Sequence, residues 1–337
     1  MLPMKEIWRI YEQGIPQEIS SFLCLPSLQR LQGVGMHCGL EYTGFPFFGQ
    51  LGPYSRYEHS LGVALICFHF SHDARCAIAG LLHDIATPCF AHVNDFLAGD
   101  YLKQEKTEEG TEEFIYARDD LLEAIFALDL CVCDVSDYRL YPLADNLAPR
   151  LCADRLEYTL SNAINFDLAT AEEVAALYAD IKVAAAEDGL PELAFQSKEK
   201  AIRFAFIALE CGRIYARDEG RYAMQALAKL LQEALKAGVI DEADLYKTEK
   251  SLLLKLTKDP RFARAWHNYR RLGKVYKTPE KIAPNSYRVD AKRRYIDPLV
   301  IGQGRAAALD ESLMRQMRSF AEESYDYYLT GGPLENR

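Results

Sequence analysis

Residues 77–92 read Ala-Ile-Ala-Gly-Leu-Leu-His83-Asp84-Ile-Ala-Thr-Pro88-Cys-Phe-Ala-His, and we expect the rest of the chain to be organised around this segment. Its first half carries enough apolar residues for a buried helix, which Pro88 then stops. An ionised Asp84 inside such a helix would cost several kcal/mol unless it is paired or coordinates a metal. Because His83 beside it is a good ligand for a transition metal, the pair predicts a metal site within the core.

The overall composition is that of a globular protein. The 337 residues are enough for one large domain or for a core domain with an appendage. Hydrophobic residues make up 49% and charged residues 26%, which is typical of a soluble protein with a sizeable core. The net charge of −10 argues against broad binding to a phosphate backbone, which needs a basic surface. This balance disfavours nucleic acid as a partner.

The cysteines and the N-terminus bear on the compartment. The nine cysteines are an odd number, most of them stand in apolar stretches, and none forms a CxxC pair. This usage predicts reduced core residues in a cytosolic protein. The N-terminus has no apolar run of signal-peptide length, and no segment approaches a membrane span. We therefore expect a cytoplasmic protein without a membrane partner.

Most of the chain carries helical patterns. Apolar stripes or helix-start signals predict helices over residues 56–71, 77–88, 121–130, 145–164 and 311–328. Between residues 169 and 255 the content of Ala, Leu, Glu and Lys favours at least three more helices. Alternating apolar and charged residues over 287–296 predict a strand. The sequence thus predicts a mainly α fold with a small β-containing C-terminal appendage.

A set of histidines and aspartates in apolar sequence provides the candidate metal ligands: His59, His83, Asp84 and Asp154. Each falls on an expected helix, so three helices could bring them to one ion. Imidazole and carboxylate ligands suit Mn, Fe, Ni, Co or Zn better than Ca. Two histidines and two carboxylates also leave positions open for a water and a phosphoryl oxygen.

Taken singly, some of these residues have structural interpretations. A lone His59 fits a helix-start or core histidine, and a lone Asp154 fits a surface ion pair with Arg150 or Arg155. Only the adjacent histidine and aspartate at 83 and 84 are hard to explain by packing alone.

Three motifs follow one another along the chain: Arg56-Tyr-Glu-His59-Ser-Leu-Gly, Leu81-Leu-His83-Asp84-Ile and Asp154. Together they resemble the HD-domain superfamily of metal-dependent phosphohydrolases. The likeness is greatest to its deoxynucleoside triphosphate triphosphohydrolase branch, of the SAM-and-HD-domain type. It implies an HD-domain helical bundle over residues 1–210. Over residues 211–337 we then expect a helical extension with a short C-terminal β segment and a final helix.

The resemblance also implies roles for site residues. The four candidate ligands would bind a divalent transition metal, Mn, Fe, Ni, Co or Zn, with Mg as a further option. Arg56 would contact substrate phosphate, and His92 would hydrogen-bond that phosphate or protonate the leaving oxygen. Tyr158 would line the pocket. The alternatives are an ion pair of Arg56 with Glu58 and ordinary core positions for His92 and Tyr158.

Two positions depart from the family pattern. Thr87 and Thr107 stand where relatives carry a histidine or another ionisable residue. Threonine cannot exchange a proton near neutral pH as histidine does. Two hypotheses follow: a hydrolase of a nucleotide or small phosphate ester that uses metal-activated water, or a metal-containing nucleotide sensor with little turnover. Self-association is expected from the resemblance.

The sequence leaves one basic and aromatic cluster without an assigned role. Residues 292–294 read Lys-Arg-Arg and stand near Tyr287 and Tyr295. They fit either a contact with a nucleotide or nucleic acid, or the solvated face of a strand.

Overall fold

The computed structural model describes residues 4–98 and 110–333. Most of its elements are helices. The α-helices are α1 (Met4–Tyr11), α2 (Gln17–Ser20), α3 (Pro26–Gln29), α4 (Arg56–Ser71), α5 (Ala74–Leu82), α6 (Val93–Ala98), α7 (Thr111–Tyr116), α8 (Asp119–Phe126), α9 (Val132–Val135), α10 (Ala153–Asn165), α11 (Ala171–Tyr178), α12 (Lys198–Tyr215), α13 (Asp218–Lys236), α14 (Glu242–Leu245), α15 (Glu249–Leu256), α16 (Pro260–Arg270), α17 (Ala306–Leu309) and α18 (Glu311–Ala321). The 3₁₀ helices are η1 (Arg30–Gly33), η2 (Leu40–Tyr42), η3 (Phe48–Gln50) and η4 (Tyr138–Leu140).

The strands form two small sheets. They are β1 (Ile181–Ala185), β2 (Pro191–Phe195), β3 (Leu272–Thr278), β4 (Ser286–Tyr287), β5 (Leu299–Val300), β6 (Gly304–Arg305) and β7 (Tyr328–Pro333). One sheet has the order β1-β2-β5-β6, in which only β2 and β5 are parallel, and the other has the order β3-β7-β4. The predicted fold class, mainly α with a small β-containing C-terminal region, is confirmed.

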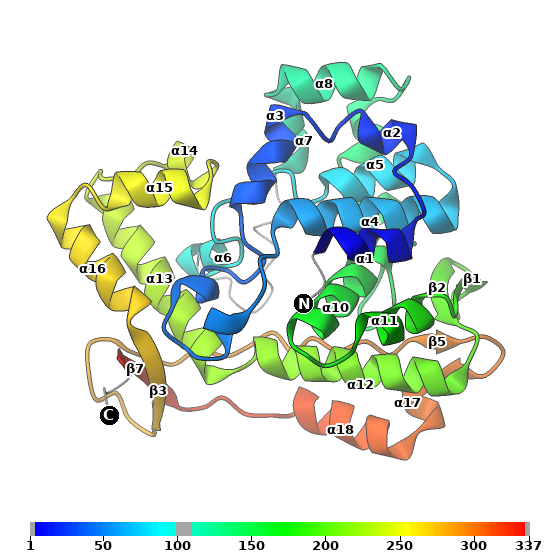
Figure 1. Cartoon of the computed structure of the whole chain (residues 1–337). Helices are drawn as coiled ribbons and strands as arrows, with labels where there is room; N and C mark the ends of the chain where they lie inside the picture. The colour runs from blue at the N-terminus through cyan, green and yellow to red at the C-terminus, as the bar shows by residue number, and fades with distance from the viewer. Residues whose placement is uncertain (1–3, 99–109, 334–337) are drawn as a thin grey trace.

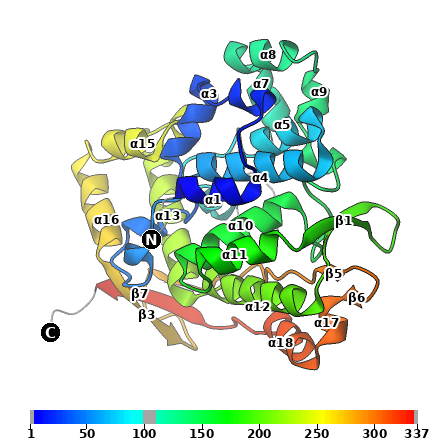
Figure 2. The ribbon, with the colours of Figure 1, turned by 45° about the vertical axis from the view of Figure 1, so that its right-hand side comes forward.

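Helix α4 lies at the centre of the first half of the chain. It packs against α1, α5 and α10, as Figures 1 and 2 show from two directions. A capping box begins the helix, because the Glu58 carboxylate accepts from the Ser55 N–H and the Ser55 side chain accepts from the Glu58 N–H. Most of its residues are buried, including His59. The bounds predicted for this helix, 56–71, are confirmed.

Helix α5 ends earlier than predicted. The expected helix ran to Pro88, but α5 stops at Leu82, so His83 is its C-cap and Asp84 lies in the following turn. Tight turns replace the helical pattern, with the N–H of Ile85 donating to the carbonyl of Leu82 at 2.9 Å. The prediction that His83 and Asp84 lie within a helix is therefore wrong. Both project from its C-terminal end.

The prediction of a helix start at residues 145–149 is also wrong, because α10 begins at Ala153. Asp145 and Asn146, which were expected to cap the helix, accept hydrogen bonds from Arg155 instead. The guanidinium donates to the Asp145 carboxylate at 2.9 Å and to the carbonyl of Asn146. The peptide bond between residues 148 and 149 is cis. Asp154 consequently lies in the first turn of α10 rather than in its middle.

The β-structure differs most from expectation. The β1–β2 hairpin stands in a region predicted to be helical, and its connecting turn contains Gly189 at φ +83°. The strand predicted over 287–296 is limited to β4, and the final helix ends at Ala321 rather than at 328. Residues 328–333 form β7, which pairs with β3 along its whole length.

Two segments connect the first half of the chain, up to about residue 210, with the second half. Helix α12 runs through residues 210 and 211, where the domain boundary was predicted, and that boundary stays a prediction. The 290–298 segment then returns from the second half to the first, where the Asp297 N–H donates to the carbonyl of Pro149 at 2.9 Å. Its close approach to α12 depends on Gly212, since a Cβ there would lie 1.9 Å from the Arg294 carbonyl oxygen. Among the described residues, no helix combines the length and apolarity that a membrane crossing requires.

Candidate metal centre

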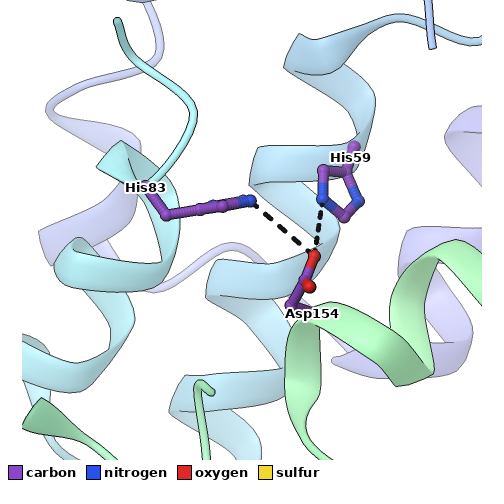
Figure 3. Close-up of side chains that lie close together, drawn as sticks. All are labelled: His59, His83 and Asp154. Atoms are coloured by element: carbon purple, nitrogen blue, oxygen red, sulfur yellow. Dashed lines mark ion pairs between the residues drawn. The ribbon is translucent and has the colours of Figure 1, made fainter. Parts of the chain in front are cut away.

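Three predicted ligands from three segments point toward one another (Figure 3). His59 comes from the first turn of α4, His83 from the end of α5, and Asp154 from the first turn of α10. The Asp154 Oδ1 lies 3.0 Å from the His59 Nε2 and 3.8 Å from the His83 Nε2. Because their ligand atoms all lie within 4.8 Å of one another, one ion can contact all three side chains.

Asp84, the fourth predicted ligand, lies beside the same group. Its Oδ2 is 3.5 Å from the His83 Nε2 and 3.9 Å from the His59 Nε2. Burial raises the pKa of this carboxyl, but the Arg56 guanidinium at 2.6 Å and the two imidazoles lower it well below its usual range. Asp84 is therefore ionised inside the core, and Arg56 pairs with it rather than with Glu58.

Thr87 forms a hydrogen bond with Asp84 that the sequence did not predict. Its side chain is fully buried, and its hydroxyl donates to the Asp84 Oδ1 at 2.7 Å. Since Arg56 holds the other carboxylate oxygen, the two contacts fix the orientation of Asp84. The Thr87 hydroxyl is therefore a positioning contact for Asp84. Thr107 lies outside the described residues.

Glu157 completes the centre and was missed by the sequence analysis. It is fully buried, and its Oε2 lies 2.5 Å from the His59 Nδ1 and accepts from the Tyr54 hydroxyl at 2.5 Å. Ser161 donates to its other oxygen at 2.6 Å. A carboxylate behind a ligating histidine fixes the ring and its tautomer. The sequence holds one indication of this contact, which is the glycine three residues after His59. A Cβ at Gly62 would lie 2.6 Å from the Glu157 Cγ, so only glycine leaves room for Glu157 there.

The protonation of the ligands fits a cation. Burial lowers the pKa of His59, but its hydrogen bonds to Asp154 and Glu157 raise it more, to about 10. Burial raises the pKa of Asp154, but its hydrogen bond to His59 lowers it to about 2. A proton on His59 therefore occupies the position that an ion would take. With Nε2 and carboxylate donors facing one point, the donor set matches a divalent transition metal.

His92 lies in the cavity wall beside these ligands. Its Nδ1 is 2.9 Å from the carboxylate of Asp95, which is fully buried. Burial lowers the pKa of His92, and although the bond to Asp95 raises it, the result is about 4, with Arg294 and Arg56 also lowering it. The imidazole is thus neutral near pH 7, with Nδ1–H directed to Asp95 and Nε2 as its acceptor atom.

A cavity of about 160 Å³ adjoins the candidate ligands, and residues from both halves of the chain line it. Tyr158, one helical turn after Asp154, also lines the cavity, and its role toward a substrate stays a prediction. The 290–298 segment contributes Lys292 and Arg294 to the lining of this cavity, and these two residues do not belong to a strand. Arg293 instead pairs with Asp290 at 2.6 Å.

Comparisons with known proteins show what this chain is similar to. The family model of the HD domain matches residues 56–131. The uncharacterized protein YdhJ of Bacillus subtilis is 28% identical over 212 residues, 59% of this chain and 60% of that protein. The metal-dependent phosphohydrolase cns2 of Cordyceps militaris is 26% identical over 232 residues, 65% of this chain and 62% of that protein. The matches thus span less than two thirds of both relatives.

A solved structure shares the fold over nearly the whole chain. A phosphohydrolase from Bacteroides thetaiotaomicron superposes with a TM-score of 0.63, covering 95% of this chain and 97% of that chain at 14% identity. The comparisons do not single out the triphosphohydrolase branch. This chain thus contains a region that matches the HD domain, residues 56–131, and it is similar to a protein named a metal-dependent phosphohydrolase.

Proposed function

We propose that the protein is a metal-dependent phosphohydrolase that acts on a nucleotide or another small phosphate ester. The observation that carries the proposal is the convergence of His59, His83 and Asp154 next to an ionised Asp84 at the wall of a cavity. When bound, a divalent metal would lower the pKa of a water and polarise a phosphoryl oxygen. The chain's own residues would bind and orient the ester.

The cationic side chains of the cavity wall suit a phosphate group. Lys292 and Arg294 line the cavity together with Arg56, which also contacts Asp84. A guanidinium offers two donors in a fixed geometry that matches phosphoryl oxygens. We infer that Arg56 links the orientation of Asp84 to that of the bound phosphate.

His92 can accept a proton or hydrogen bond, whereas Tyr158 can donate one. The neutral imidazole of His92 suits the acceptance of a proton or hydrogen bond at Nε2 more than donation to a leaving oxygen. Burial raises the pKa of Tyr158 above its ordinary value, so its hydroxyl stays protonated and can donate. In this account Tyr158, rather than His92, supplies the hydrogen bond to a phosphate or leaving-group oxygen.

The proposal is tested by phosphate and triphosphate release from dNTPs, NTPs and nucleoside monophosphates with Mn, Fe, Ni or Mg supplied. Turnover should require a metal and should be absent in His83→Ala. The matched control is His267→Ala, because His267 is exposed on α16 and distant in sequence from all ligands. Turnover that persists in His83→Ala at the level of this control would contradict the proposal.

A second function is supported by Thr87. Its hydroxyl donates a hydrogen bond to Asp84 and cannot exchange a proton near neutral pH. Because it offers no general acid or base, it fits a metal-containing nucleotide sensor with little turnover. Tight nucleotide binding without turnover under every metal would favour the sensor over the hydrolase.

A further inference from the structure

Cys131 and Cys133 form a pair of thiols outside the metal centre, and the sequence assigned neither of them a role. Both side chains are exposed, and their Sγ atoms are 2.7 Å apart. A disulfide bond is about 2.0 Å long, so a small rotation of either side chain brings the two sulfurs to bonding distance. The other exposed cysteine, Cys24, is far from this pair in the sequence. The pair is therefore the place where exposed thiols can react with each other.

Helix α9 holds the two thiols in place. Cys131 is the residue before its first turn, and Cys133 lies within it. Val132 and Val135 of the same helix are buried, and α9 packs against α5. The backbone that carries the thiols is thus anchored while the sulfurs face solvent. Two groups held this close react with each other as if each were present at high concentration, which favours an internal bond over one to an outside thiol.

Asp134 distinguishes the two thiols. Its Oδ2 accepts hydrogen bonds from the N–H and from the Sγ of Cys131, each at 2.8 Å. The bond from the thiol to this carboxylate raises the pKa of Cys131 to about 11, and Cys133 adds to the rise. Since the thiolate is the nucleophile in disulfide exchange, Cys131 is the slower of the two to attack an outside disulfide. Cys133 is then the thiol that reacts first.

We propose that Cys131 and Cys133 form a redox-active dithiol, which a small disulfide such as glutathione disulfide oxidises to an internal disulfide. The Cys133 thiolate attacks one sulfur of glutathione disulfide, and one glutathione leaves as its thiolate. The Cys131 sulfur then attacks the Cys133 Sγ, loses its proton to solvent and releases the second glutathione. Two cysteine thiols are oxidised, and one glutathione disulfide is reduced to two molecules of glutathione. This site is independent of the proposed function.

Mass spectrometry of the native protein tests the dithiol, because trypsin separates its two thiols from all others. Cleavage after Arg118 and Arg139 gives a peptide that contains no third cysteine. After incubation with glutathione disulfide and blocking of the remaining thiols, we expect this peptide to lack two hydrogen atoms and to carry no glutathione. Cys24, the exposed control, should carry one glutathione. A 119–139 peptide that carries glutathione, or that stays unchanged while Cys24 reacts, would contradict the proposal.

The dependence on glutathione concentration gives a second test at equilibrium. An internal disulfide releases two molecules of glutathione, whereas an adduct on a single thiol releases one. Raising glutathione and its disulfide together by about tenfold should lower the ratio of oxidised to reduced dithiol by about tenfold and leave the Cys24 adduct unchanged. A dithiol that stays as constant as Cys24 would overturn the internal disulfide.

Single variants test the order of attack. In Cys131→Ser the remaining Cys133 should gain glutathione at least about threefold faster than Cys131 does in Cys133→Ser, because Asp134 keeps Cys131 protonated. Both substitutions are at exposed positions, so the fold should be retained. Adding Asp134→Asn to Cys133→Ser should speed the reaction of Cys131. A Cys131 that reacts faster than Cys133 while Asp134 is intact would overturn this order.

Discussion

Two groups of side chains in the described structure place three ligand atoms within 4.8 Å of one another, and they differ in burial. The first is the centre at His59, His83 and Asp154. The second is Cys131, Cys133 and Asp134 on and beside the short helix α9, where the two Sγ atoms are 2.7 Å apart.

The difference lies in what surrounds the ligand atoms. His59 and His83 are buried, and Glu157 fixes the His59 ring from behind. Both cysteines are exposed, and Asp134 accepts from Cys131 itself, so the cluster satisfies its own hydrogen bonds. Proximity alone is therefore a weak criterion for a metal site. Burial of charge together with supporting hydrogen bonds distinguishes the first group.

The largest effect should come from Asp84. Asp84→Ala is expected to lower phosphate release by more than about 100-fold, beyond the range for supporting residues, because it removes an ionised carboxylate beside the candidate centre and the partner of Arg56. Steady-state phosphate release at saturating metal measures this. Cys133→Ser is the control from the exposed group, and a similar loss there would end the distinction between the two groups.

A change at Glu157 tests whether its hydrogen bond to the His59 Nδ1 contributes to metal binding. Glu157→Gln should weaken metal binding by roughly 10–100-fold, the range found for residues that orient ligating histidines. Competition with a chromogenic chelator gives the affinity. Glu173→Gln is a suitable control, because Glu173 pairs with Arg203 on the surface. Unchanged affinity in Glu157→Gln would show that His59 is oriented without it.

The pH dependence of metal binding follows from His59. The pKa of His59 is raised to about 10 in the metal-free protein, so an ion must displace a proton at neutral pH. Affinity should therefore rise by about tenfold per pH unit between pH 7 and 9. In the metal-free protein, the stabilisation from this proton is present below about pH 6.5 and is lost as the pH rises through about 10. A metal affinity that is flat over this interval would contradict a protonated His59.

The smallest effect is expected at Thr87. Thr87→Val keeps the shape of the side chain but removes the hydrogen bond to Asp84, which should cost about 1 kcal/mol of unfolding free energy. Urea denaturation of the metal-free protein measures this change. Thr87→Ser keeps the hydroxyl and should lose less, and the reverse order would mean that packing, not the hydrogen bond, is what Thr87 contributes.

Much of the centre could be predicted from sequence because its residues are anomalous where they stand. A histidine and an aspartate in an apolar run have few structural explanations, and the order of the motifs supplied His59 and Asp154. The fold class followed from the helical patterns in the same way. The exposed positions of Cys24, Cys131 and Cys133, in contrast, were not expected from the apolar surroundings of most cysteines.

The rest depended on contacts between distant segments. Glu157 reads as an ordinary polar residue of a helix, and its burial becomes visible only when α10 meets Gly62 on α4. The early end of α5 and the pairing of β7 with β3 are likewise tertiary effects that override local propensity. The cytoplasmic location and self-association expected from the sequence stay predictions.

Metal content is the most direct test of the central claim, that the buried group and not the exposed one holds an ion. The purified protein, reconstituted with Mn, Fe, Ni, Co or Zn, should contain about one equivalent by elemental analysis. Cys131→Ser and Cys133→Ser should keep it, and His83→Ala should lose it. A full equivalent in His83→Ala, or one lost only with the cysteines, would contradict the account.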